Sequence, residues 1–133
     1  MRTLYDECLD ALNGNYELLP KKEDQQLSEI IEKLFPTMLM GNIDWEKVIH
    51  KKKIIKVQDM LDVFNESELV IIFWDNGGDR ALITTLKSFI NALNEVTIVS
   101  FDTYVFFPQY KCLIEFYHDG TITMGYSNET IKQ

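Results

Sequence analysis

The run from Glu68 to Trp74 constrains the fold more than any other segment. Its apolar part, LVIIFW, is a continuous series of aliphatic and aromatic residues, most of them β-branched or aromatic. Such a run is typical of a central strand that is buried on both faces. The triplet Asn76-Gly77-Gly78 breaks the strand, and Asp79 is then placed to cap a helix. The apolar positions of that helix are Leu82, Leu86, Phe89, Ile90 and Leu93. The pattern therefore predicts one β-α unit.

Four short strand-like segments follow, at residues 96–101, 104–107, 112–118 and 121–126. Asp119-Gly120 separates the last two segments, and this dipeptide is a strong hairpin signal. We expect a two-residue turn that pairs His118 with Thr121 and places Glu115 opposite Met124. Glu115 then shares a sheet face with Leu113, Tyr117, Ile122 and Tyr126. A carboxylate there needs an internal partner or access to water.

The N-terminal half reads mainly as helix. Apolar residues recur at helical spacing over residues 4–12, and Asn13-Gly14-Asn15 ends that pattern. A second amphipathic helix follows Pro20 and ends at Pro36. Shorter helices are expected after Asp44 and over residues 57–64. We predict one domain over residues 1–133, of the α/β (α+β) class. Its N-terminal helices, β-α unit and antiparallel meander form a single mixed sheet with helices packed on it.

Size and terminal sequence indicate a cytoplasmic protein. A chain of 133 residues is long enough to bury a core without metal or disulfide staples. No segment approaches the ~20 apolar residues that span a bilayer. The first residues include two acids and no apolar stretch behind them, which excludes a secretory signal. Cys8 and Cys112 belong to no CxxC pair and are expected to be reduced core thiols.

The charge is unevenly distributed. The net charge is −8, and residues 57–133 hold 11 acids against 4 bases. Residues 44–56 have the opposite balance, with five lysines against Asp44 and Glu46. An acidic field repels nucleic acid and anionic membranes and attracts basic partners. We therefore expect neither direct nucleic-acid binding nor membrane binding.

No motif for catalysis or cofactor binding is present. The spacings HxxxH, HExxH, CxxC, GxGxxG and GxxxxGK[ST] do not occur. The glycine turn at residues 75–79 carries two carboxylates, which disfavour a phosphate. The enzymatic alternative is a Mg²⁺-dependent phosphodiesterase built on the four carboxylates Asp75, Asp79, Asp102 and Glu115. A basic substrate surface is missing, so we expect no enzyme and no cofactor.

The C-terminal half resembles a known family. The stretches that carry the likeness are Phe73-Trp74-Asp75, VSFDTY at residues 99–104 and IEFYHDGTIT at residues 114–123. They resemble immunity proteins of contact-dependent growth inhibition and related polymorphic toxin systems. The likeness covers roughly residues 68–126. It implies a small cytoplasmic inhibitor that binds the C-terminal toxin domain from a neighbouring cell, often a nuclease with a basic cleft.

The family pattern does not say which residues bind the toxin. We therefore predict acids expected to be exposed as the toxin-binding set: Glu66, Glu68, Asp75, Asp79, Asp102 and Asp119, together with Glu115 if it lies at a wet rim. Such acids would steer the protein toward a basic cleft. Two alternatives remain beside the immunity protein, namely another protein-binding adaptor and the carboxylate-metal enzyme.

Overall fold

The computed structural model describes residues 1–39, 41–76 and 78–131. It contains one seven-stranded sheet with the order β1-β4-β3-β5-β6-β7-β2. The strands are β1 (Tyr16–Leu18), β2 (Lys51–Ile54), β3 (Leu69–Trp74), β4 (Leu82–Thr85), β5 (Thr103–Phe107), β6 (Cys112–Phe116) and β7 (Ile122–Tyr126). A single sheet with helices packed on it is confirmed. Its pairing, expected to be mixed, is antiparallel between all described neighbours.

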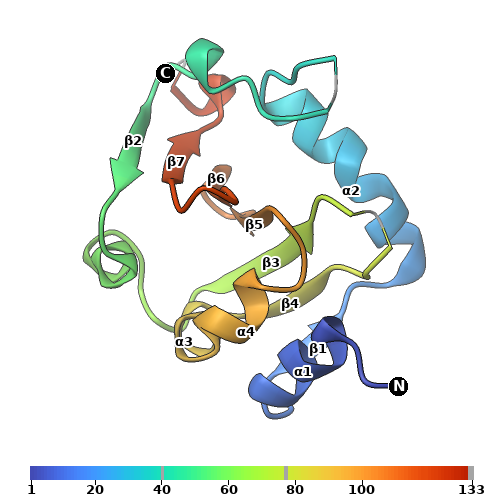
Figure 1. Cartoon of the computed structure of the whole chain (residues 1–133). Helices are drawn as coiled ribbons and strands as arrows, with labels where there is room; N and C mark the ends of the chain where they lie inside the picture. The colour runs from blue at the N-terminus through green and yellow to red at the C-terminus, as the bar shows by residue number, and fades with distance from the viewer. Residues whose placement is uncertain (40, 77, 132–133) are drawn as a thin grey trace.

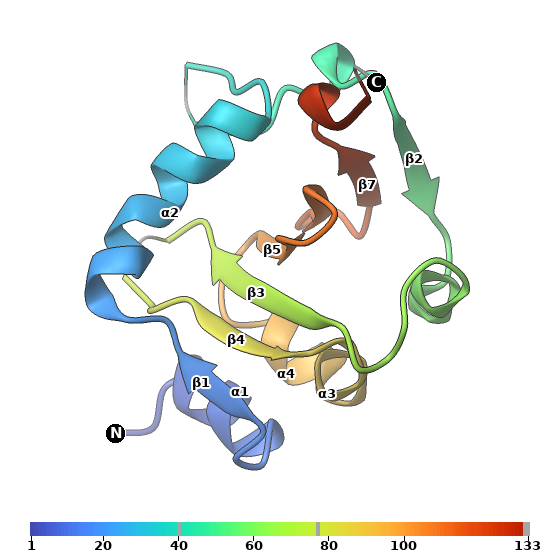
Figure 2. The same cartoon turned by 180° about the vertical axis from the view of Figure 1, so that it is seen from behind.

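Helices cover both faces of this sheet (Figures 1 and 2). The helices α1 (Leu4–Ala11), α3 (Leu86–Asn91) and α4 (Leu93–Thr97) contribute Cys8, Phe89 and Val96 to the larger core. On the other face α2 (Lys21–Leu34) packs Leu27 and Ile31 against the sheet in a second core. Below, the two sides are called the α4 face and the α2 face. The run at β3 is an interior strand between β4 and β5, as its composition predicts.

The first two helices follow their sequence signals. Thr3 caps α1, because its hydroxyl accepts the Asp6 backbone N–H while the Asp6 carboxylate accepts the Thr3 N–H. Asn13 and Gly14 take positive φ values of 52° and 79° and end the helix. After α2, Phe35 is extended because it precedes Pro36.

The predicted β-α unit is wrong in its second half. After β3 the chain turns back into β4, which pairs with both β3 and β1. The helix begins at Leu86, and its N-cap is Thr85, whose hydroxyl accepts the Ser88 N–H at 3.1 Å. Asp79 caps no helix, and Leu82 lies in a strand. The alternation of buried and half-buried residues in LITT suits a strand better than a helix. Gly77 of the predicted break lies outside the described residues.

The strand predicted at residues 96–101 is also wrong. Residues 93–97 form α4, and the rest of the segment is a turn. Val96 is fully buried because it lies at helical spacing from Phe89 and Leu93, which pack against the same core. The strands predicted at 104–107, 112–118 and 121–126 are confirmed as β5, β6 and β7.

The two short helices expected in the middle of the chain are present as 3₁₀ helices. These are η1 (Trp45–Lys47) and η2 (Val57–Asp62), and Asp44 makes no side-chain cap. The edge strands β1 and β2 were not predicted. Three of the four residues of β2 are exposed lysines, so no apolar alternation marks it as a strand. Lysines on an edge strand discourage pairing with other chains.

The β6–β7 hairpin differs from its predicted register by one residue. Glu115 pairs with Thr123 and Ile114 with Met124. The turn has three residues, since the Tyr117 N–H donates to the Thr121 carbonyl and Gly120 takes a φ of 94°. A slip of one residue exchanges the faces of a strand. Ile122 and Tyr126 therefore pack into the α4 face, opposite to Glu115.

Candidate functional site

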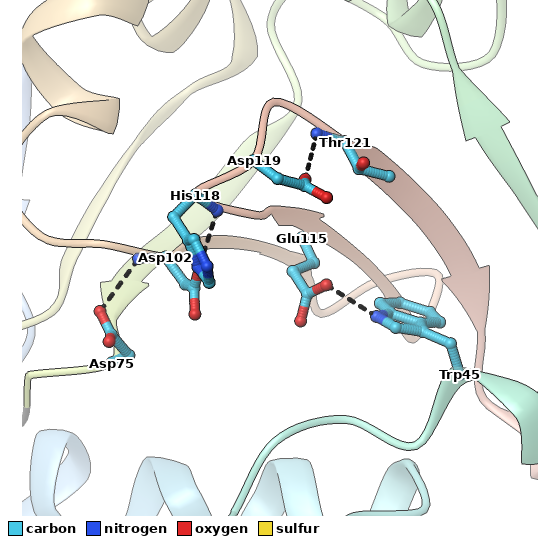
Figure 3. Close-up of polar contacts among 7 residues, drawn as sticks. All are labelled: Trp45, Asp75, Asp102, Glu115, His118, Asp119 and Thr121. Atoms are coloured by element: carbon cyan, nitrogen blue, oxygen red, sulfur yellow. Dashed lines mark hydrogen bonds and ion pairs between the residues drawn. The ribbon is translucent and has the colours of Figure 1, made fainter.

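Three loops meet at one end of the sheet and bring polar side chains together (Figure 3). They follow β3, precede β5 and connect β6 to β7. An Asp75 carboxylate oxygen accepts the Asp102 backbone N–H at 3.1 Å, and the Asp75 N–H donates to the Asp102 carbonyl at 3.3 Å. The Asp102 Oδ1 atom in turn accepts the His118 backbone N–H at 2.8 Å and lies 3.0 Å from its Nδ1. This end of the sheet is therefore a hydrogen-bonded unit.

Asp102 holds this unit together from the inside. Asp102 is only 7% exposed, so the prediction that it is an exposed acid is wrong. The carboxylate is buried without an Arg or Lys partner because two groups of His118 satisfy it. Asp102 positions the hairpin and is not accessible for a toxin.

Asp119 lies at the tip of the same hairpin and is exposed. Its carboxylate accepts the Thr121 backbone N–H at 2.8 Å, and this bond lowers the pKa of Asp119. The side chain is thus fixed in place, still ionised, and open to solvent on its other side. It can meet a base on a partner.

The sequence left open whether the Glu115 carboxylate has an internal partner or lies at a wet rim, and the structure shows an internal partner. Glu115 is 6% exposed, and its Oε1 accepts the indole N–H of Trp45 at 3.0 Å. Burial raises the pKa of Glu115, and hydrogen bonds from Trp45 and Tyr104 oppose that shift. The carboxylate has internal partners and does not lie at a rim, so Glu115 supports the fold from inside the α2 face.

A hollow of about 470 Å³ opens on the α2 face beside Asp75. Its polar lining includes four carboxylates, Asp24, Glu32, Asp75 and Asp79. Its lining also includes Phe73 and Tyr104, whose rings stack 5.1 Å apart at 14°. We call it the acidic hollow. A cavity that combines carboxylates with aromatic rings suits a cationic side chain.

Among the described residues, no base forms an ion pair with a carboxylate of this hollow. Within the described ranges the ion pairs join Arg2 to Asp10, Lys47 to Asp44 and His118 to Asp102. The Asp79 carboxylate instead accepts the Asn76 amide at 2.6 Å, and Asp24 accepts the Ala81 N–H at 2.9 Å. The carboxylates are oriented by neutral donors and keep their charge available.

Glu66 and Glu68 lie away from this group. They precede β3, whereas Asp75 follows it, so roughly 20 Å of strand separates them. Glu66 is exposed, and Glu68 accepts the Tyr110 hydroxyl at 3.0 Å. The seven predicted acids therefore do not form one surface. Asp75, Asp79 and Asp119 lie with the buried Asp102 at the end of the sheet where the three loops meet, and we call this end the acidic end. Glu115 is internal, and Glu66 and Glu68 lie at the opposite end of the sheet.

Two of the carboxylates proposed for an enzyme are occupied by internal hydrogen bonds. Asp102 accepts the His118 backbone N–H, and Glu115 accepts the Trp45 indole N–H. In the part of the chain that the structure describes, no group of three or more His, Cys, Asp or Glu residues is placed to hold a metal ion. What the acidic end offers is a surface of fixed negative charge.

Sequence reasoning missed the residues that complete the hollow. Asp24 and Glu32 belong to α2, and only the packing of α2 on the sheet brings them to Asp75. Their spacing of eight residues on one helix was the available signal, since it places both side chains on roughly one face. Trp45 was expected only as an apolar residue of a short helix, and nothing in its sequence context indicated Glu115.

No helix of the described ranges is long and apolar enough to cross a membrane. Comparison with protein families identifies the class as the immunity proteins of contact-dependent growth inhibition, which neutralise a toxin. Residues 2–125 match the family described as CdiI immunity protein EcoliA0-like, and the chain belongs to this family. The match confirms the resemblance at residues 68–126 and extends it through the N-terminal helices. No curated protein matches the chain.

Proposed function

We propose that this immunity protein neutralises a nuclease toxin in the cytoplasm by covering its basic cleft with the acidic end of the sheet. Asp75, Asp79 and Asp119 would contact the toxin, with Asp24 and Glu32 as further ligands for its basic side chains. Asp102 would hold the contact loops in place. Glu66 and Glu68, at the opposite end, remain a second possible contact.

The acidic hollow is the observation that carries the proposal. Four carboxylates surround one cavity, and neutral donors orient two of them without cancelling their charge. Burying such charges against an apolar partner is unfavourable, whereas an arginine or lysine compensates them. The net charge of −8, most of it in residues 57–133, adds a longer-range attraction for a basic partner.

A nuclease is the toxin class that best suits this charge. Enzymes that cleave nucleic acids bind phosphates through basic clefts. A carboxylate surface competes for the same positive charges and accelerates association by electrostatic steering. Nucleic acids fill the cytoplasm, so a fast-binding inhibitor there would intercept the toxin before it reaches its substrate.

The test is a kinetic comparison with the cognate toxin domain, which is to be sought in the neighbouring reading frames. The double variant Asp75→Lys/Asp79→Lys should lower the association rate at least about tenfold, since it changes the local charge by four units. The control Asp59→Lys/Asp62→Lys makes the same change at exposed positions of η2. Equal association rates for the two variants would refute the assignment of the acidic hollow. The pair Glu66→Lys/Glu68→Lys tests the opposite end.

The nuclease assignment needs a separate assay. Purified toxin should degrade RNA or DNA, and the wild-type protein should stop the degradation at a molar ratio of one. A toxin that instead depolarises membranes would show that the partner class is wrong, even if the two proteins bind.

A further inference from the structure

We infer that a second hollow, on the α4 face of the same end, receives an apolar side chain of the toxin that is flanked by basic residues. This inference rests on the proposed function and adds a separate contact to it. The acidic hollow would set how fast the toxin binds, and this apolar hollow would set how long it stays.

The hollow has a volume of about 690 Å³ and lies between α4 and the β6–β7 hairpin. Its apolar lining comes from Leu93 and Ile98 on one side, Phe101 in the turn before β5, and Phe116 and Ile122 on the strands. Tyr117 and His118 line it from the hairpin. We call it the aromatic hollow.

Large apolar side chains are exposed around it. Phe101 is 77% exposed, Ile98 59% and Tyr117 36%. Single exposed apolar residues are ordinary, but three of them around one concavity mark an interaction surface. Aromatic side chains contribute much of the binding free energy at protein interfaces when a partner covers them.

The aromatic side chains are already held in place. The His118 ring lies 4.1 Å from the Tyr117 ring and 6.0 Å from the Phe101 ring, with centroids as reference points. Asp102 fixes His118 through its backbone and its ring. A surface ordered before binding loses little conformational entropy when the partner docks. Asp102 is therefore a positioning residue for both hollows.

The charges at the rim indicate what flanks the incoming apolar group. Asp119 lies between His118 and Gly120 of the lining and is exposed at the hairpin tip. Asp75 lines the acidic hollow and adjoins this side of the sheet through its hydrogen bond to Asp102, the residue after Phe101. Lys56 adjoins Val57 of the lining, whereas Asp119 adjoins His118 and Gly120, so the acidic charge lies on the hairpin side of the hollow. A partner with basic residues beside its apolar side chain complements that rim.

A second copy of this chain fits the rim poorly. A two-fold dimer through this end would bring Asp75 and Asp119 of both copies into one interface. Juxtaposed like charges oppose such an association. The toxin, which the acidic hollow also requires to be basic, is the consistent occupant.

The experiment measures toxin association and dissociation rates for Phe101→Ala and for Ile98→Ala/Phe101→Ala. Dissociation should be at least about tenfold faster for Phe101→Ala, as for a side chain at the centre of an interface, and faster still for the double variant. Association should change by less than about twofold, because the charges are intact. Ile49→Ala, which truncates a 68% exposed residue in the lysine-rich segment before β2, is the control and should leave both rates unchanged.

The outcomes separate this inference from the proposed function. If wild type binds the toxin and Phe101→Ala dissociates at the wild-type rate, the aromatic hollow is not a contact and the inference fails alone. If wild type does not bind the neighbouring toxin, both fail. A wild-type dimer in light scattering that Phe101→Ala makes monomeric would assign the hollow to self-association and overturn the inference.

Discussion

The indole N–H of Trp45 donates to the Glu115 carboxylate at 3.0 Å and joins residues 70 positions apart in the chain. Glu115 is part of a row across the sheet, because it pairs with Tyr104 on β5 and Thr123 on β7, and Thr123 pairs with Lys53 on β2. The Lys53 ammonium donates to the Thr123 hydroxyl at 3.0 Å. The row gives the α2 face a polar strip beside its apolar core.

The first prediction concerns pH and Glu115→Gln. Burial raises the pKa of Glu115 above its ordinary value of 4.5. A carboxyl group whose pKa is higher in the folded than in the unfolded chain contributes stability that is fully present below the unfolded pKa. That contribution is lost as the pH rises through the folded pKa. Glutamine does not titrate, so the free energy of unfolding of Glu115→Gln should rise relative to wild type between about pH 4 and pH 7. Urea denaturation at the two pH values measures this.

The same exchange at the exposed Glu17 is the reference for Glu115→Gln. If the stability difference between Glu115→Gln and wild type is the same at both pH values, burial does not raise the pKa of Glu115. A glutamine at 115 retains an acceptor for the Trp45 indole, so the fold itself is not at risk.

The second prediction concerns Gly125, over which Trp45 packs. A Cβ atom at Gly125 would lie 2.6 Å from Cζ3 of Trp45 and 3.0 Å from Cγ1 of Val48. Gly125→Ala should therefore displace the indole and lower the free energy of unfolding by roughly 1–3 kcal/mol. Gly78→Ala is the matched control, since nothing lies within 4 Å of its Cβ position. Equal stability of the two variants would contradict this packing.

The third prediction concerns the buried carboxylate of Asp102. Asp102→Ala removes the acceptor for the His118 backbone N–H and for the ring, and should cost about 1–3 kcal/mol of stability. His118→Ala loses only the ring contact and should cost less, because its backbone N–H still bonds to Asp102. Thermal denaturation of the two variants gives the order, and a larger loss for His118→Ala would reverse the assigned roles.

The fourth prediction concerns the two cysteines. Cys8 and Cys112 are fully buried, and burial raises the pKa of each thiol to about 12. Neither should react with a thiol reagent in the folded protein at neutral pH, since the thiolate is the reactive form. Both should be labelled once the chain is unfolded in guanidinium. Rapid labelling of either thiol under native conditions would place it at the surface.

The meander was predictable because its signals are local. The segments that became β5, β6 and β7 alternate or run apolar, and Asp119-Gly120 marks their turn. The register escaped prediction because a two-residue and a three-residue turn share the same dipeptide. A two-residue type I′ turn needs positive φ at both Asp119 and Gly120, whereas only Gly120 takes one here. The additional loop residue shifts the register by one position and so determines which face of the sheet Ile122 and Tyr126 occupy.

The site was predictable only in part, because long-range packing builds it. Asp75 and Asp119 are exposed in loops, as their positions after or between predicted strands indicate. Asp24 and Glu32 reach the acidic hollow only through the docking of α2. Asp102 lies in a turn-like sequence, and its burial depends on a hydrogen bond to a hairpin 16 residues later. Sequence position alone does not encode that contact.

The central claim is that negative charge at the acidic end recruits a basic toxin, and the salt dependence of association tests it most directly. Association of the wild-type protein with the neighbouring toxin should slow by an order of magnitude or more between about 0.05 M and 0.5 M salt, since screening shortens the range of the field. Asp75→Lys/Asp79→Lys should show a much shallower dependence. A wild-type association rate that is the same at both salt concentrations would contradict the claim.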